Sequence, residues 1–419
     1  MKLDLIKEEI IKHINAGNSL EALYRKDTNL FQRAFNDVYQ DIKGSETAMV
    51  WHERLNFKGE GISIRKKDDF IFISLLSIVS GIIANVPNFF SLIPDDFFQK
   101  NIGFVVFPIL MVFFLRKQPF SIKNILFPVI SILLSALFIN LFPNSIASDT
   151  FILACIHLPI FLWAVLGYVF IEGDLSFYQM KIDFLRYNGN LVVMTAILLL
   201  SGALFSGITI GLFSLIGFDI IEFYMEHIAI WGLAAIPVVA SYLVQHNPQL
   251  VNNISPVIAR IFTPIVFITL LVFSSAMMFA KENIYHDRNF LIIFNALLLG
   301  VMAIILFSAT ETSRSIDKKI NYLFLFGISM LTIVLNGIAL SAILFRLTEF
   351  GITPNRVAVL GTNLLVFINL LLVAHKLFLV IKGRADVQKV EHAITLFIPL
   401  FGIWAAFVTF ILPLLFCFK

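Results

Sequence analysis

The pattern of apolar and polar residues changes near residue 70. From Phe70 onward, apolar runs of about twenty residues alternate with short polar breaks, and a hydrocarbon core of roughly 30 Å demands helices of that length. Because the second run is short and residues 190–244 can be divided in more than one way, counts of ten and twelve stay open beside the best count of eleven. The runs predict membrane-spanning helices near residues 70–93, 102–115, 124–143, 150–171, 190–217, 221–245, 258–280, 289–310, 322–345, 355–381 and 393–418.

Residues 1–64 have the pattern of a small soluble unit. Apolar residues recur at helical spacing up to Gly17, Ser19 can cap a second helix, and two further amphipathic segments follow. The pattern predicts a helical N-terminal domain over residues 1–64, a basic linker over 65–69 and a transmembrane domain over 70–419. About 60 residues build only a marginal core, so we expect this domain to dock on the membrane domain or on a protein partner.

The composition excludes an ordinary soluble protein. Hydrophobic residues make up 58% of the 419 residues and charged residues 14%, against roughly 45–50% and 25% in soluble domains. We therefore predict an all-α fold, a polytopic bundle of transmembrane helices with membrane lipids as its surroundings. The net charge of +3 is small, and nucleic acid is not an expected partner.

The distribution of basic residues predicts the orientation, since lysine and arginine concentrate in cytoplasmic segments. With the N-terminus inside, the outer segments hold six basic residues, namely Lys100, Lys281, Arg288, Arg346, Arg356 and Lys419. The inner segments hold sixteen, namely Arg65, Lys66, Lys67, Arg116, Lys117, Lys123, Lys181, Arg186, Arg260, Arg314, Lys318, Lys319, Lys376, Lys382, Arg384 and Lys389. The split predicts a cytoplasmic N-terminus and an external C-terminus.

Four polar residues inside the predicted spans form one layer. Counted at about 1.5 Å per residue, they lie roughly 9–14 Å below the outer surface. One interpretation is a set of separate interhelical hydrogen bonds of about 0.6 kcal/mol each; the other is the floor of a cavity open to the outer face. The residues are His157, Asn295, Asn336 and Asn363.

The most structured outer segment is the turn from Arg346 to Arg356, RLTEFGITPNR. Gly351 can end the ninth span, Thr353 can cap the tenth, and Pro354 suits a first helical turn. Arg346, Glu349 and Arg356 could bind an anionic headgroup or substrate, with Glu222 and Glu226 converging on them, because arginine recognises phosphate and carboxylate well. Alternatively, the arginines extend to lipid headgroups and pair with these acids.

No familiar catalytic motif is present. The sequence lacks a zinc-protease helix motif, a nucleophile-elbow serine and a phosphate-cradling glycine loop. Its two cysteines, Cys155 and Cys417, lie in predicted spans and lack metal-ligand spacing. We therefore expect no catalytic residue, cofactor or metal site.

Three segments carry a resemblance to a known family: FLRYNG from Phe184, NNISPVIARIFTP from Asn252 and, above all, ILFRLTEFGITPNRVAVLGTNLL from Ile343. In these segments the chain resembles a family of bacterial inner-membrane proteins known only as a domain of unknown function, over roughly residues 70–419. The resemblance implies a multi-pass protein of the bacterial inner membrane. It implies no substrate, cofactor or catalytic residue.

Three functions follow from these patterns. The first is transport or flipping of a small or lipid-linked anionic compound, with a polar site open to the outer face. The second is an integral-membrane enzyme that acts on a lipid-linked substrate held by Arg346 and Arg356. The third is a scaffold or signalling component that contacts a protein partner through residues 1–64.

Overall fold

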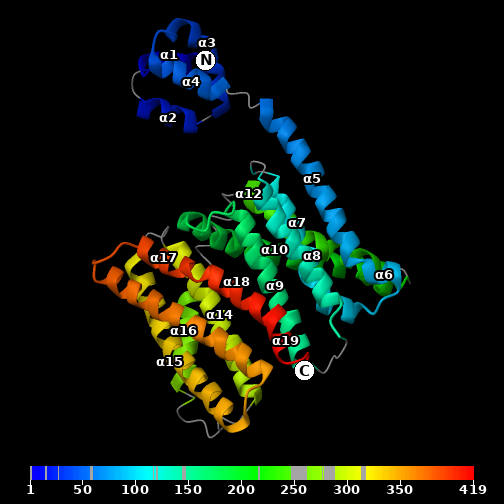
Figure 1. Ribbon diagram of the computed structural model, residues 1–419. Helices are drawn as coiled ribbons and strands as arrows, with labels where there is room; N and C mark the ends of the chain where they lie inside the picture. Colours follow the sequence, from blue (N-terminus) through cyan, green and yellow to red (C-terminus); the bar gives the residue numbers. More distant parts are fainter. Residues whose placement is uncertain are drawn as a thin grey trace. The chain divides into compact units, whose positions relative to one another are not determined.

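A computed structural model describes most of the chain, and Figure 1 shows its helices in sequence order. The described residues contain no strand. They form two compact units, Met1–Phe72 and Ile73–Lys419. The predicted all-α class is therefore confirmed. The described residues are 2–14, 17–26, 28–56, 60–116, 118, 121–143, 148–215, 218–246, 262–275, 277, 288–312 and 318–419.

The N-terminal unit contains four short amphipathic helices. Phe31 and Phe35 are fully buried in their shared core, and Trp51 is 6% exposed. The Trp51 ring lies 5.3 Å from the Phe31 ring, centroid to centroid, a separation typical of favourable aromatic packing. One aromatic cluster thus holds the unit together. The helices are α1 (Lys2–Lys12), α2 (Gly17–Lys26), α3 (Thr28–Ile42) and α4 (Glu46–Asn56).

The boundary of the membrane region differs from the prediction. Helix α5 (Glu60–Ala84) is continuous through the predicted linker, and it ends nine residues before the predicted end of the first span. A short α6 (Val86–Phe90) follows and stops at Ser91, whose φ of 51° is left-handed. Pro94 then starts the next helix eight residues before the predicted residue 102, because proline suits the first turn of a helix.

Eight helical segments among the described residues are long and apolar enough to cross a membrane. The protein is therefore membrane-embedded, as predicted. Two shorter apolar helices, Phe262–Ser275 and Leu297–Ala309, fall within further predicted spans. The eight are Pro94–Leu115 (α7), Ile122–Asn140 (α8), Asp149–Phe170 (α9), Tyr178–Leu215 (α10), Ile221–His246 (α11, η1 and α12), Asn321–Phe350 in α15, Pro354–Ile381 (α16) and Gln388–Leu415 (α17, α18, η2 and α19).

Helix α10 is longer than its predicted span. It has 38 residues, and at about 1.5 Å per residue it exceeds the roughly 30 Å hydrocarbon core. Its first twelve residues, which include Arg186 and Asn188, were expected in a polar loop before residue 190. They are helical and place these side chains inside the bundle.

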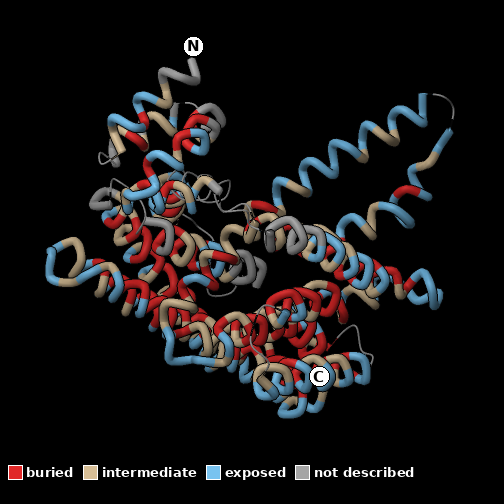
Figure 2. The backbone as a smooth tube through the Cα atoms, turned by 90° about the horizontal axis from the view of Figure 1, so that it is seen from above, coloured by how far each residue is buried: buried red, intermediate tan, exposed pale blue. Residues whose placement is uncertain are grey.

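The C-terminal helices share the largest apolar core of the membrane unit. Residues of α10, α14 (Arg288–Thr312), α15 (Lys318–Phe350), α16 and α17 (Gln388–Leu396) pack together in it. Figure 2 shows buried and exposed residues alternating along the helices. Helices α15 and α16 make the most extensive contact of any pair among the described helices. Their antiparallel pairing sets the register of the polar residues described below.

The last span is not one continuous α-helix. Helix α17 ends at Leu396, α18 covers Ile398–Ala406, and a π-helical turn η2 (Phe407–Ile411) precedes α19 (Leu412–Leu415). Pro399 and Pro413 lie just after the two irregular points, and proline has no N–H to continue an α-helical ladder. The span is therefore divided into short helical segments.

Candidate functional site

Polar side chains line the interior of the C-terminal bundle from one end to the other. We call this set the polar seam. Such residues are costly in hydrocarbon and in membrane proteins commonly mark solute or ion pathways. The seam consists of Arg186, Tyr322, Asn336, Asn363, Asn369, Glu391 and Asn295.

The seam begins at a buried ion pair between α10 and α17. A guanidinium nitrogen of Arg186 lies 3.1 Å from a carboxylate oxygen of Glu391, and the side chains are only 12% and 7% exposed. Arg186 also contacts Asp183 at 3.1 Å, but that carboxylate is 49% exposed. A buried pair of this kind loses hydration on both ions, so its attraction must offset a large desolvation cost. Because of this desolvation cost, packing alone is a poor explanation for the ion pair.

Tyr322 adds a neutral polar group beside this pair. It lies on α15, close enough to Glu391 for the two to interact electrostatically. Its hydroxyl is buried and has no hydrogen-bond partner among the described residues. A buried O–H usually finds a partner, so this end of the seam has unused donor capacity next to a carboxylate.

Asn369 lies where the last span breaks. The N–H of Phe397 bonds to the carbonyl of Thr395, which leaves the carbonyl of Ala393 without its usual α-helical donor. The amide nitrogen of Asn369, on α16, donates to that carbonyl at 3.2 Å. The amide oxygen of Asn369 is buried and has no partner within the described structure. One side chain thus stabilises the break and leaves an acceptor facing the bundle.

Asn336 is the most unusual residue of the seam. It is fully buried on α15, and neither its amide nitrogen nor its amide oxygen has a partner among the described residues. Each unpaired buried polar group costs about 1–3 kcal/mol. Gly337 lies opposite Phe367 on α16, since a Cβ on Gly337 would lie 4.0 Å from that ring. This pairing of α15 with α16 puts Asn336 and Asn369 at nearly the same depth in the membrane.

Two residues of the predicted layer do meet. The amide nitrogen of Asn363 on α16 donates to the amide oxygen of Asn295 on α14 at 2.7 Å. At the adjacent residue, the indole N–H of Trp404 on α18 donates to the Thr362 hydroxyl at 3.0 Å. Gly361 permits this approach, because a Cβ there would clash with the Trp404 ring. These contacts tie α14, α16 and α18 together at the far end of the seam.

The remaining member of the predicted layer is elsewhere. His157, on α9, hydrogen-bonds through Nδ1 to the carbonyl of Leu153 in its own helix at 2.9 Å. Asn336 shares the bundle with Asn295 and Asn363, but by the pairing of α15 with α16 it lies deeper than Asn363. Of the four predicted residues, Asn295 and Asn363 are therefore in contact, Asn336 lies in the same bundle, and His157 lies elsewhere.

The predicted arginine turn joins α15 to α16 with the expected caps. Gly351 has a φ of 76°, and the Thr353 hydroxyl accepts the N–H of Arg356 at 3.4 Å. The guanidinium of Arg356 donates to the carbonyl of Phe350 at 2.8 Å and to that of Gly351. Arg346 is half-buried and Glu349 is exposed. Arg356 thus has a structural role in closing the end of α15.

The predicted acidic partners lie on other helices. Glu222 is exposed on α11 (Ile221–Tyr224), and Glu226 is exposed on the π-helical turn η1 (Met225–Ala229). The backbone carbonyl of Glu226 accepts a hydrogen bond from Asn88 of α6 at 3.3 Å.

Sequence reasoning missed Arg186, Glu391, Tyr322 and Asn369. Arg186 and Glu391 were assigned to cytoplasmic loops because each lies only a few residues outside a predicted span. Asn369 follows Asn363 by six residues within one predicted span, and this was the one available signal. Comparison of the chain with protein-family models, with curated proteins and with solved structures finds no match.

Proposed function

We propose that the protein transports a small solute across the membrane along the polar seam. The observation that carries this proposal is Asn336, whose amide nitrogen and amide oxygen lie in a fully buried position and have no hydrogen-bond partner among the described residues. A solute that bonds to both groups would recover their lost hydration. The unpaired oxygen of Asn369 at a similar depth supplies a second acceptor.

The proposed substrate class rests on the charges at one end of the seam. Arg346 and Arg356 lie at the α15–α16 turn, whereas Arg186 at the opposite end is paired with Glu391 and Asp183. Cations at the α15–α16 end favour entry of a small anionic or lipid-linked anionic compound. The enzyme alternative has less support, because the seam offers amides and one neutralised ion pair rather than a nucleophile beside a base.

The proposal includes the predicted topology of eleven spans in a bacterial inner membrane with the N-terminus inside. The eight long helices support this proposal, and α5 and the two shorter apolar helices are its candidates for the further spans. The discontinuous last span supports the proposal, since many transporters bind their substrate beside broken helices.

Cysteine accessibility tests the proposal. In a background with Cys155→Ala and Cys417→Ser, single cysteines replace Ser329 and Ala339, which are both fully buried on α15 on either side of Asn336. A membrane-impermeant maleimide is applied from each side of proteoliposomes. Alternating access predicts that Ser329→Cys reacts from one side and Ala339→Cys from the other.

The matched control is Leu162→Cys on α9, which is equally buried in a different apolar cluster. It should stay unreactive from both sides. If Ser329→Cys and Ala339→Cys are as unreactive as the control under every solute and ion gradient applied, the seam never opens and the transport proposal is refuted.

A protein contact through residues 1–64 is a second proposal, supported by exposed apolar side chains on the N-terminal unit. Val50 is 67% exposed, and Met49 and Ile11 are each 46% exposed. Apolar groups left in water favour a binding partner. Deleting residues 1–64 should then leave transport intact and abolish copurification of a partner; loss of transport itself would contradict an independent contact role.

A further inference from the structure

Two carboxylates share one guanidinium at the α17 end of the polar seam. One nitrogen of Arg186, Nη1, lies 3.1 Å from Asp183, and the other, Nη2, lies 3.1 Å from Glu391. The Asp183 side chain is 49% exposed, whereas that of Glu391 is only 7% exposed. If Glu391 takes up a proton, Arg186 therefore keeps an ionised partner in Asp183, so the uptake does not leave the guanidinium without a carboxylate.

The buried carboxylate depends on a balance that a proton can change. An ionised Glu391 has lost most of its hydration, and its side chain has one hydrogen-bond partner among the described residues, Arg186. A protonated Glu391 avoids the desolvation cost and gains an O–H donor. The buried Tyr322 hydroxyl, which has no partner within the described structure and interacts electrostatically with Glu391, can accept that bond. Both protonation states of Glu391 therefore have a polar neighbour inside the bundle.

The other titratable groups near this end of the bundle do not pair with Glu391. On α17 itself, His392 is exposed, and its ring lies 5.8 Å from that of Tyr178 on α10. The described side chains of α14 and α18 include no titratable group. Arg186 is therefore the cation that contacts Glu391 in the described part of the chain. No ion pair or hydrogen bond joins Glu391 to the described residues Tyr178, Lys181, His375, Lys376, Lys389 and His392.

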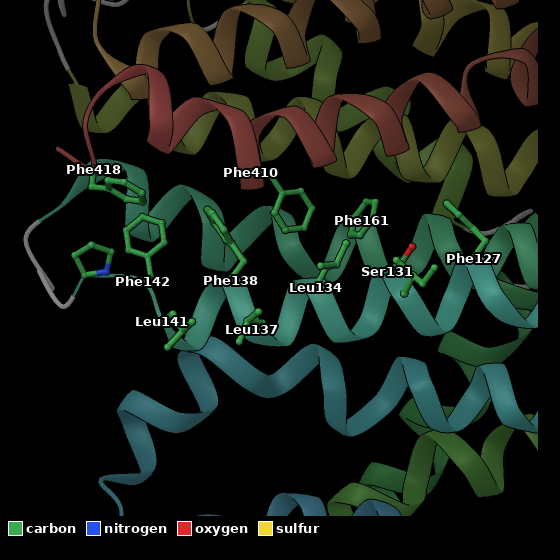
Figure 3. A pocket seen from close by; sticks show the side chains of 12 residues that line it. Phe127, Ser131, Leu134, Leu137, Phe138, Leu141, Phe142, Phe161, Phe410 and Phe418 are labelled. Atoms are coloured by element: carbon green, nitrogen blue, oxygen red, sulfur yellow. The ribbon is translucent and has the colours of Figure 1, made fainter.

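The ion pair holds the part of the last span that is separated from the rest by a break. Helix α17 ends before Phe397, and the span beyond the break is anchored by aromatic contacts. Figure 3 shows Phe410 of this part beside Phe138 of α8 and Phe161 of α9, with ring centroids 5.2 Å and 5.3 Å away. Loss of the contact between Glu391 and α10 should therefore loosen α17 while the remainder of the span stays in place.

We propose that Glu391 binds a proton that is cotransported with the solute, and that its protonation releases α17 from α10. This inference rests on the transport proposed above and names the ion that drives it. An anion that enters a cell moves against an interior-negative potential at about 2.3 kcal/mol per charge per 100 mV, and a proton carried with it offsets one charge. Ionisable residues inside membrane bundles commonly form proton relays. The proton adds to a carboxylate oxygen of Glu391 from water on one side and returns to water on the other.

Cysteine accessibility at different pH values tests the coupling without a known solute. The full-length protein with Ser329→Cys, in the background that lacks Cys155 and Cys417, is reconstituted in proteoliposomes and treated with the impermeant maleimide from the α17 side. Its rate is divided by that of Gln388→Cys, an exposed position on α17, at the same pH, which cancels the pH dependence of the reagent. Acidification of that side should raise the ratio severalfold.

Variants assign this response to Glu391. Glu391→Gln imitates the protonated carboxyl, so its ratio should be high at every pH. Asp386→Asn is the matched control, because Asp386 is an exposed carboxylate five residues earlier in the chain, and it should keep the response of the unaltered protein. Asp183→Asn should move the response to more acidic pH, since it removes the other carboxylate that Arg186 contacts. A ratio that does not change with pH when Glu391 is present, or an acid response that survives in Glu391→Gln, would overturn the proposal.

Infrared spectroscopy detects the bound proton directly. On acidification the unaltered protein should gain the carbonyl band of a buried protonated carboxyl, which Glu391→Gln should lack and Asp386→Asn should keep; identical spectra for the unaltered protein and Glu391→Gln would contradict proton binding. Failure of transport itself has a different signature, because Ser329→Cys and Ala339→Cys would then stay unreactive at every pH, and both proposals would fall. If the two cysteines instead react from opposite sides regardless of pH and of Glu391, transport stands and the coupling to protons is wrong.

Discussion

Separating the partners of the Arg186–Glu391 pair should destabilise the C-terminal bundle, whereas replacing both should not. With Arg186→Met alone, Glu391 keeps a carboxylate whose side chain is only 7% exposed and loses its 3.1 Å contact. An uncompensated buried charge costs about 3–5 kcal/mol. Asp183, which also loses its contact with Arg186, adds a second negative charge at the same place.

The double variant Arg186→Met/Glu391→Met has a different expectation. Replacing both partners of a buried pair with apolar side chains of similar volume is often neutral, or stabilising by about 1–4 kcal/mol. The two substitutions should therefore be strongly non-additive, as expected for groups in direct contact. If the pair has a role in transport, the double variant should fold normally and still lose transport.

Unfolding in mixed detergent micelles measures these free energies. Trp163 of α9 is a suitable fluorescence reporter, because its indole N–H donates to Asn188 of α10 at 2.9 Å, two residues from Arg186. Asp183→Asn is the control, since an exposed ion pair contributes only about 0–1 kcal/mol. Single-variant losses no larger than that of Asp183→Asn, or a double variant as unstable as the sum of the singles, would refute the reasoning.

Two further predictions concern the α15–α16 turn and the N-terminal unit. Arg356→Met removes two hydrogen bonds to helix-end carbonyls and should lower the unfolding free energy by about 1–3 kcal/mol. Because it also removes a cation from this end of the seam, it should slow transport of an anion; unchanged stability would contradict the capping role of Arg356. Hydrogen bonding from Arg25, with a further contribution from Arg54, holds the pKa of Glu21 below its usual value. This stabilisation is therefore present above about pH 4.3 and disappears as the pH falls through the lowered pKa. Hydrogen exchange of α2 and α4 in the full chain should differ between the unaltered protein and Glu21→Gln near neutral pH and converge in acid; a difference that persists in acid would contradict this assignment.

The features that the sequence predicted well depend on local chemistry. Apolar runs predicted the spans because each helix must by itself be long enough to cross the hydrocarbon core. The α15–α16 turn was predicted to the residue, since a left-handed glycine, a threonine cap and a first-turn proline each act within four residues. Such rules need no knowledge of the neighbouring helices.

The features that could not be predicted from the sequence depend on tertiary contacts. Arg186 lies 205 residues before Glu391 in the chain, and nothing in either segment indicates that they meet. The predicted loop before residue 190 continues α10 because its residues pack against the bundle, where Ile182 and Phe184 are buried. Hydropathy detects lipid-facing residues, so it underestimates helices whose polar side chains face a protein interior.

The short helix α17 links the ion pair to the amide groups of the seam in the transport proposal. It carries both Glu391, which pairs with Arg186, and Ala393, whose carbonyl is held by Asn369. Because the span breaks at Phe397, a rotation of α17 as a rigid segment would release both contacts at once while α18 stays in place. The freed Asn369 amide would then lie at the depth of Asn336, so the opening of this end and the change at the solute site would be one event. In that case Ser329→Cys should become reactive from the α17 end of the membrane, whereas reactivity from the α15–α16 end alone would exclude α17 as the moving part.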